Sequence, residues 1–156
     1  MVMLGWFTGL LDEQYGFILL SDEKWWNRLC ERCRGGKKTH AFVRRNLVGP
    51  KKAEKLLFYV KRPSMQIKGA ADFIERLAGD PKELWEKYGD ETCLNSYKEY
   101  LAFLKGREKA TFIRFTNFFE LENPIPFEAL KKLSGILKVP RGGKYISREI
   151  VNQLIT

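Results

Sequence analysis

The sequence predicts a single α+β domain built on a mixed or barrel-like β-sheet. The chain has 156 residues, of which 44% are hydrophobic and 13% aromatic, so it can bury one substantial core. Short strand-forming segments and short amphipathic helices follow one another without the regular alternation of a doubly wound parallel sheet. We therefore expect one domain over residues 1–156, with residues 1–38 forming a strand and helix extension packed on it.

The expected elements follow from apolar periodicity, capping residues and turn residues. Strands are expected within 4–20, which reads as strand, turn and strand, and at 40–43, 56–60, 67–77 and 110–121. Helices are expected at 22–34, after Asp80, after Ser96, at 127–137 and after Ser147. The apolar run 56–60 is typical of a buried central strand. The segment Asn123-Pro124-Ile125-Pro126 is expected to break the last long strand.

The positive charge is distributed unevenly along the chain. The formal net charge is +9, yet residues 24–68 carry 14 Lys or Arg against two acids, Glu31 and Glu54. The rest of the chain carries 14 basic and 17 acidic residues. A segment this one-sided is typical of a surface that attracts a polyanion, and nucleic acid is the usual partner. The alternatives are a charged surface of the thermophile kind and a cationic loop without a partner.

Several classes of protein are not expected from the composition. No apolar run approaches the roughly 20 residues of a membrane-spanning helix. Residues 1–20 lack the basic start and the cleavage site of a secretory signal. Three cysteines do not make a disulfide framework. We therefore expect a cytoplasmic protein with no membrane partner and no cofactor.

Several segments together resemble a known superfamily. A basic loop leads into Leu57-Phe58-Tyr59-Val60, and the return segment reads Ile67-Lys68-Gly69-Ala70-Ala71-Asp72-Phe73-Ile74. Downstream, Thr111-Phe112-Ile113-Arg114-Phe115 precedes Asn123-Pro124-Ile125-Pro126, and Pro140-Arg141-Gly142-Gly143-Lys144-Tyr145 leads into Ser147-Arg148-Glu149. From about residue 39 onward the chain is similar to the PUA-like superfamily of PUA, ASCH, EVE and YTH domains. It looks closest to uncharacterised archaeal members of that superfamily.

The resemblance implies a mixed β-pseudobarrel with several short peripheral helices, and RNA as the commonest class of partner. The sequence departs from ASCH domains, because their Gly-x-Lys with a following Glu and Arg is absent at the expected place. It also lacks the YTH motifs that build a cage for methylated adenine. The resemblance therefore implies neither a particular ligand nor a particular activity.

Ten basic side chains are predicted to contact the phosphates of a nucleic acid. Seven lie on or next to strands that should be neighbours, and we expect them to form one patch: Arg44, Arg45, Lys51, Lys52, Lys61, Arg62 and Lys68. Three belong to or follow a glycine-rich loop whose backbone N–H groups could also bind phosphate: Arg141, Lys144 and Arg148. A plain turn before the last helix explains this loop equally well.

Four aromatic side chains are candidates for stacking on unpaired bases: Trp6, Trp25, Trp26 and Tyr145. The alternative is that they belong to the core, as most of the 21 aromatic residues should. Trp25 and Trp26 are adjacent on a predicted helix, so the two rings cannot point the same way. We expect one of them to be buried and the other to be partly exposed.

A metal site is a weaker possibility. Cys30 and Cys33 have C-x-x-C spacing, and His40 and Cys93 would complete a Cys3His set. The cysteine pair lies late on a predicted helix rather than on a turn, and no second C-x-x-C exists. Small buried cysteines on an apolar stripe explain the pattern equally well, so we expect no metal.

The sequence thus predicts a non-catalytic module that binds RNA or a modified nucleotide, with a basic face on the phosphates and an aromatic-lined cleft for a base. One alternative is a small amidohydrolase-like enzyme acting on a modified nucleoside in the same cleft. The resemblance implies that such an enzyme would use Lys61, Lys68 or Lys144 with Glu75 or Glu149. The other alternative is a protein-interaction domain, including a homodimer, that docks through the aromatic region at residues 6–26.

Overall fold

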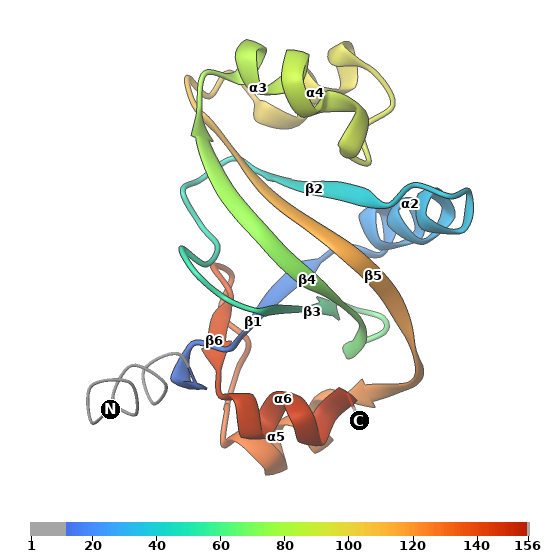
Figure 1. Cartoon of the computed structure of the whole chain (residues 1–156), viewed down its shortest axis with the longest axis vertical. Coiled ribbons are helices and arrows are strands. Elements are labelled where there is room, and N and C mark those ends of the chain that lie inside the picture. The colour runs from blue at the N-terminus through green and yellow to red at the C-terminus, as the bar shows by residue number, and fades with distance from the viewer. Residues whose placement is uncertain (1–11, 156) are drawn as a thin grey trace, which may run out of the picture.

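A six-stranded mixed sheet runs through the molecule, as a computed structural model that describes residues 12–155 shows (Figure 1). The strands are β1 (Gly16–Ser21), β2 (Thr39–Arg44), β3 (Lys55–Val60), β4 (Gln66–Gly79), β5 (Ala110–Pro126) and β6 (Lys144–Ile146). Their order across the sheet is β2-β5-β4-β3-β1-β6. Among these six strands of the described residues, only β1 and β3 pair in parallel, and the other four pairs are antiparallel. The predicted α+β class with a mixed sheet is confirmed.

Five α-helices and one short 3-10 helix surround the sheet over residues 12–155. They are α2 (Glu23–Arg34), α3 (Pro81–Tyr88), η1 (Gly89–Glu91), α4 (Tyr97–Leu104), α5 (Phe127–Ser134) and α6 (Arg148–Ile155). Three predicted caps are formed, because Asp80, Ser96 and Ser147 accept the backbone N–H three residues onward at 3.0, 3.1 and 3.3 Å. None of the helices in this part of the chain is long and apolar enough to cross a membrane.

The long strands β4 and β5 form a bent ribbon that carries the helices. The ribbon runs from α3 and α4 at one end of the molecule to α5 and α6 at the other (Figure 1). The predicted break at residue 123 is wrong, because β5 continues to Pro126, which pairs with Gln66. Only β4 pairs with this last part of β5, so the opposite edge is free in the described structure, and prolines are tolerated on such an edge.

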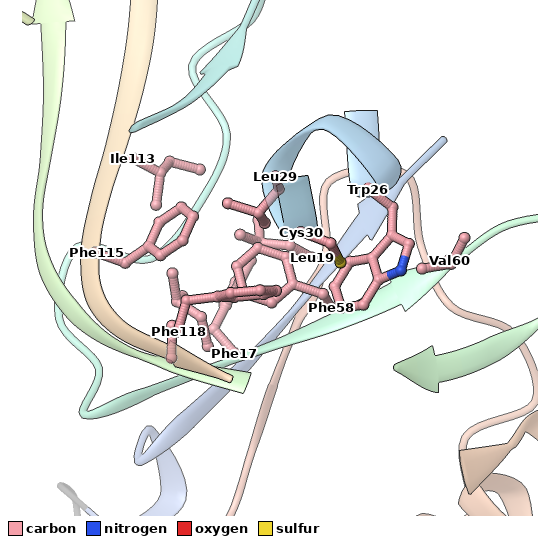
Figure 2. Packing of buried hydrophobic residues seen from close by; sticks show 12 residues of the cluster. Phe17, Leu19, Trp26, Leu29, Cys30, Phe58, Val60, Ile113, Phe115 and Phe118 are labelled. Carbon is pink, nitrogen blue, oxygen red and sulfur yellow. The ribbon is translucent and has the colours of Figure 1, made fainter. Parts of the chain in front are cut away.

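The largest hydrophobic cluster lies between α2 and the sheet. Trp26, Leu29 and Cys30 of α2 pack against Phe58 of β3 and Phe115 of β5 (Figure 2). The run at 56–60 is β3, whose pairing with β1 and β4 and full burial of Leu56 to Val60 confirm a buried internal strand.

Trp26 explains the small residues on β4. A Cβ atom at Gly69 would lie 2.5 Å from the ring of Trp26 and 2.8 Å from the carbonyl oxygen of Phe119. Glycine at this position therefore lets the edge of the indole ring approach the strand backbone closely. The result fixes one of the two adjacent tryptophans in the core, where only 3% of its surface is exposed.

Two smaller clusters anchor the ends of the sheet. One joins Ile18 and Leu57 to α5 and α6 through Leu130 and Val151. The other joins α3 and α4 to β5, with Tyr100 fully buried. The predicted strand near residue 17 is β1, whereas the strand expected before it lies outside the described residues.

Candidate functional site

A cleft of about 600 Å³ opens where β2 ends, between that strand, the start of α2 and the segment 138–142. Apolar side chains that include Leu20, Val48 and Val139 form part of its lining. The charged residues that line it are Arg44, Arg45, Lys61, Lys138, Arg141 and Asp22. Five cations against one acid give the cleft a formal charge of +4. A concave site with one sign of charge concentrates anionic ligands.

Arg44 is the most constrained cation of the cleft. Its Nε atom is buried and has no hydrogen-bond partner among residues 12–155. Its guanidinium group lies 5.0 Å from the centre of the Phe42 ring, and its Nη2 lies 3.5 Å from the carbonyl oxygen of Arg141. Burial lowers the pKa of Arg44, and the nearby charge of Asp22 only partly opposes this. Arg44 is partly buried, and burying part of a cation without an ion pair costs free energy, which is typical of a ligand-binding site.

Aromatic rings form one wall of the cleft. Trp25 and Phe103 meet edge to face with ring centres 5.7 Å apart. The guanidinium group of Arg45 lies 5.3 Å from the centre of the Phe103 ring. This combination of partly exposed rings and cations suits both the base and the phosphate of a nucleotide.

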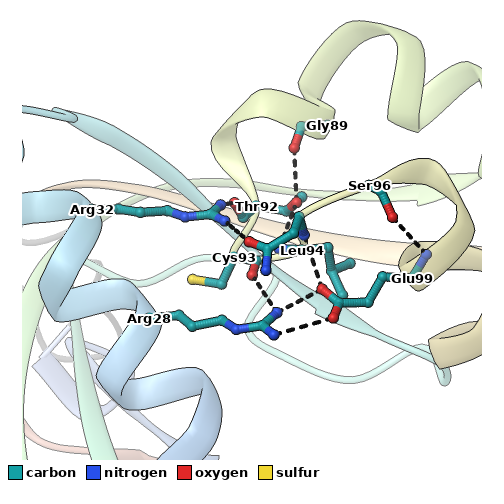
Figure 3. Close-up of polar contacts among 9 residues, drawn as sticks. Arg28, Arg32, Gly89, Thr92, Cys93, Leu94, Ser96 and Glu99 are labelled. Atoms are coloured by element: carbon teal, nitrogen blue, oxygen red, sulfur yellow. Dashed lines mark hydrogen bonds and ion pairs between the residues drawn. The ribbon is translucent and has the colours of Figure 1, made fainter.

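Two arginines of α2 hold the loop that carries Cys93 and Leu94 into the cleft (Figure 3). Arg28 donates to the carbonyl oxygen of Cys93 at 3.1 Å and to both carboxylate oxygens of Glu99 at 2.6 and 3.1 Å. Arg32 donates to the carbonyl oxygen of Thr92. The bond from Arg28 holds the pKa of Glu99 at about 2, so this carboxylate is charged at neutral pH.

The thiol of Cys93 is not suited to act as a nucleophile. Burial raises its pKa to about 11, against the weaker opposing charges of Arg32 and Arg28. The thiolate is the reactive form of cysteine, and it is scarce at neutral pH when the pKa is this high. Cys93 therefore contributes apolar surface to the cleft.

A second, shallower hollow of about 490 Å³ lies next to the cleft. Its lining residues are Gln14, Gly49, Lys51, Lys52, Arg76 and Tyr145. It contains three cations and no acid. The hydroxyl group of Tyr145 accepts a hydrogen bond from the backbone N–H of Lys51 at 3.1 Å.

The structure divides the ten predicted phosphate contacts into three groups. The cleft contains Arg44, Arg45, Lys61 and Arg141, and the second hollow contains Lys51 and Lys52. Neither space is lined by Arg62, Lys68, Lys144 or Arg148. Arg148 instead pairs with Asp12 at 2.7 Å and lies over the Tyr15 ring. Of the seven side chains expected to form one patch, Arg62 and Lys68 thus lie outside both spaces.

Sequence reasoning missed two cations of this region, Lys138 and Arg76. Lys138 lies just before the glycine-rich segment, and its closeness to Arg141 in sequence was an available signal. Arg76 lies on β4, far in sequence from the loop whose Gly49 carbonyl accepts its hydrogen bond at 2.9 Å. Only the folded sheet brings Arg76 and the Gly49 loop together.

The predicted aromatic contacts have different positions. Trp25 lines the cleft and is partly buried, whereas Trp26 belongs to the core, so the expected division of the pair is confirmed. The prediction that Trp26 stacks on a base is wrong, because its ring is covered by Phe58, Phe118 and Gly69. Tyr145 lines the second hollow. Trp6 lies outside the described residues.

The glycine-rich segment forms a turn. The N–H of Gly143 donates to the carbonyl oxygen of Pro140 at 2.9 Å, and its φ angle of 85° favours glycine. A Cβ atom there would lie 2.3 Å from the Phe17 ring. Lys144 begins β6 rather than ending a loop. The turn explains these glycines by local packing, while Arg141 and Gly142 still line the cleft.

The cysteine and histidine residues do not assemble into a metal site. Over residues 12–155, no three His, Cys, Asp or Glu side chains come together in a way that could hold a metal ion. His40 is buried and stacks on Phe115 with ring centres 5.5 Å apart. Burial raises the pKa of Cys30 to about 12. Cys33 lies beside the same core, and its thiol contacts the carbonyl oxygen of Phe118.

The lysine and glutamate residues suggested for catalysis are also dispersed. Of these five, only Lys61 lines the cleft, where its Nζ lies 2.8 Å from Asp22. Glu75 forms an ion pair with Arg114 at 2.5 Å instead.

The architecture is similar to that of an ASCH protein of known structure. The crystal structure of the ASCH protein from Zymomonas mobilis has a TM-score of 0.73 and 22% identity, covering 91% of this chain and 94% of that one. A serine-to-alanine variant of the same protein has a TM-score of 0.74 and 24% identity, covering 92% and 96%. At this level of identity the likeness establishes the fold.

The sequence itself places the chain in a family. Residues 26–148 match the family described as a domain of unknown function, DUF365, and the chain belongs to it. That stretch includes β2, the cleft residues from Arg44 to Arg141 and the whole of β4 and β5. No curated protein matches the sequence.

Proposed function

We propose that this protein is a non-catalytic module that binds single-stranded RNA, or a modified nucleotide within it, in the cleft at the end of β2. The observation that carries the proposal is the lining of that cleft, with five cations, one acid and an aromatic wall. Arg44, Arg45, Lys138 and Arg141 form no ion pair with an acid of residues 12–155. Their charges are available to phosphate groups.

The aromatic wall supports an unpaired base as the second part of the ligand. Trp25 and Phe103 border the same space as Arg45 and Arg141. Stacking of a base on an aromatic ring requires that the base be unpaired, as in single-stranded RNA. A cleft of about 600 Å³ is in the range of ordinary small-ligand sites, so one nucleotide can enter it.

A non-catalytic role is supported by the chemistry of the cleft. Its one acid, Asp22, is bound to Lys61, and its one thiol, Cys93, is held neutral by burial. The amidohydrolase alternative is tested by incubating the pure protein with modified nucleosides. Product formation would support that alternative and would contradict the non-catalytic role.

A cytoplasmic location fits the cysteines, because all three are free thiols. Association of two copies through residues 6–26 stays a prediction, which light scattering tests. The burial of Trp26 removes one of the aromatic side chains on which that prediction depends.

Charge reversal in the cleft tests the proposal. We expect wild-type protein to bind fluorescein-labelled oligouridylate, with an affinity that falls steeply as salt is added. The double variant Arg45→Glu/Arg141→Glu should lose at least about 100-fold in affinity, because two phosphate contacts become repulsions. Both side chains are exposed, so the fold should be retained.

The matched control is Lys82→Glu/Lys87→Glu on α3. It makes the same change in net charge at two exposed lysines that do not line the cleft. Its affinity should stay within about threefold of wild type, since screened charges far from the ligand contribute little. Equal losses in the two double variants, or no binding by the wild type, would contradict the proposed site.

A further inference from the structure

The cleft and the second hollow share two segments of the chain. In the loop at 46–49, Asn46 and Val48 line the cleft, whereas Gly49 lines the hollow. At the turn into β6, Gly142 lines the cleft and Tyr145 lines the hollow. The two spaces therefore adjoin each other along the loop at 46–49, which we call the ridge.

This ridge is fixed in shape by contacts to the sheet. Arg76 Nη1 of β4 donates to the carbonyl oxygen of Gly49 at 2.9 Å. Just beyond the ridge, the N–H of Lys51 donates to the hydroxyl group of Tyr145 at 3.1 Å. Gly49 has a φ angle of 108°, and a Cβ atom there would lie 2.6 Å from Ile113. At Gly49 the backbone of the ridge thus packs directly on the sheet.

The charge on the far side of the ridge has the same sign as that of the cleft. Lys51, Lys52 and Arg76 line the hollow without an acid among its lining residues. None of the three forms an ion pair within residues 12–155. Three unpaired cations in a depression suit a phosphate group, and no base is needed to explain them.

We propose that the hollow is a second phosphate subsite, so that the protein binds an extended strand that crosses the ridge rather than a single nucleotide. The inference rests on the proposed function of the cleft and adds the length and path of the ligand. A base of the strand lies in the cleft against the aromatic wall of Trp25 and Phe103. The strand then passes over residues 46–49 and places a later phosphate beside Lys51 and Lys52. The ridge itself presents Leu47, whose side chain is 66% exposed, as an apolar surface for the sugar or base of the crossing nucleotide.

The test compares a labelled dinucleotide with a labelled dodecanucleotide of uridine in fluorescence anisotropy. The wild type should bind the longer ligand more tightly, because only it reaches both subsites. The double variant Lys51→Gln/Lys52→Gln should lose about tenfold in affinity for the dodecanucleotide and should leave the dinucleotide unchanged. Its plot of log affinity against log salt should be flatter by roughly 1.4, since each phosphate contact on a single strand contributes roughly 0.7.

The matched control Lys82→Gln/Lys87→Gln removes two exposed charges of α3 and should leave both affinities and the slope unchanged. Equal wild-type affinity for the two ligands would overturn the second subsite, and so would an unchanged salt slope in Lys51→Gln/Lys52→Gln. If binding still depends on Arg45 and Arg141, the proposed function of the cleft stands without the subsite. If the wild type binds neither ligand, the proposed function itself fails.

Discussion

Arg44 Nη2 lies 3.5 Å from the carbonyl oxygen of Arg141, although the two residues are 97 positions apart in the sequence. The contact joins the end of β2 to the turn before β6, at opposite ends of the strand order. The sheet must therefore bend until its two edge regions face each other across the cleft. The position of Arg44 follows from that bend, and the unpartnered Nε marks the cost of holding a cation there.

Replacing Arg44 with methionine should separate binding from stability. The variant Arg44→Met keeps a long flexible side chain over Phe42 but removes the partly buried charge. We expect the free energy of unfolding to stay the same or to rise by up to about 2 kcal/mol, because a desolvated cation without an ion pair is lost. Affinity for single-stranded RNA should fall at least about tenfold, or about 1.4 kcal/mol.

Chemical denaturation and anisotropy measure the two effects on one preparation. The matched control Arg107→Met changes an exposed arginine that does not line the cleft, and it should alter neither quantity. A large loss of stability in Arg44→Met with full RNA affinity would show that Arg44 supports the fold and not the ligand.

The two adjacent tryptophans should respond oppositely to truncation. Trp26→Ala removes a buried ring from the core and should cost about 3–5 kcal/mol in the free energy of unfolding. Trp25→Ala should cost clearly less stability, because its ring is only partly buried. It should instead weaken RNA binding by about 1–3 kcal/mol, the usual range for one base stacked on an aromatic ring.

Denaturation curves and binding isotherms of the two variants check this pair. Because the substitutions are neighbours on one helix, their effects on helix propensity are nearly the same. Unchanged RNA affinity in Trp25→Ala would remove Trp25 from the binding site.

Stability should decline as the pH falls below about 6.5, and His40 should cause the decline. Burial lowers the pKa of His40 in the folded protein below its ordinary value of 6.5. The unfolded chain then binds the proton more readily, so the contribution to stability is fully present above pH 6.5 and is lost as the pH falls toward the folded pKa. His40 is the only histidine in the sequence, so few other groups titrate in this range.

The measurement is the free energy of unfolding by urea at several values between about pH 7.5 and 5, where the unperturbed histidine titrates. His40→Phe replaces the ring that stacks on Phe115 with a ring that does not titrate. Its stability should be nearly flat across this window, whatever its absolute value. If the free energy of unfolding depends on pH equally in the variant and the wild type, other groups produce that dependence.

Local signals predicted most of the elements correctly. Asp80-Pro81-Lys82-Glu83 and Ser96 gave the starts of α3 and α4, since a cap depends on residues within one turn. The end of β5 was mispredicted for a nonlocal reason. Whether Pro124 and Pro126 break a strand depends on which edge has a partner, and only the pairing with β4 decides that.

The candidate site was predicted less completely than the fold. The sequence identified Arg44, Arg45 and Arg141 as cations, and the resemblance implied a barrel-like sheet, but neither predicted Lys138 or Phe103 as part of the cleft. Lys68 belongs to the same basic stretch of sequence and lies outside the cleft. Counting charge along the chain does not show which face of a strand a side chain occupies, because that depends on bulges such as the one between Ile67 and Gly69.

Backbone amide shifts of ¹⁵N-labelled protein during titration with oligouridylate test the central claim most directly. We expect saturable shifts concentrated at residues 41–48 and 138–142 and at Trp25. The amide shifts of residues on the exposed face of α3 should not change. The shifts should weaken together as salt is added, because phosphate contacts supply most of the affinity. Saturable shifts confined to other surfaces, or none at any oligonucleotide concentration, would contradict the assignment of this cleft as a nucleic-acid-binding site.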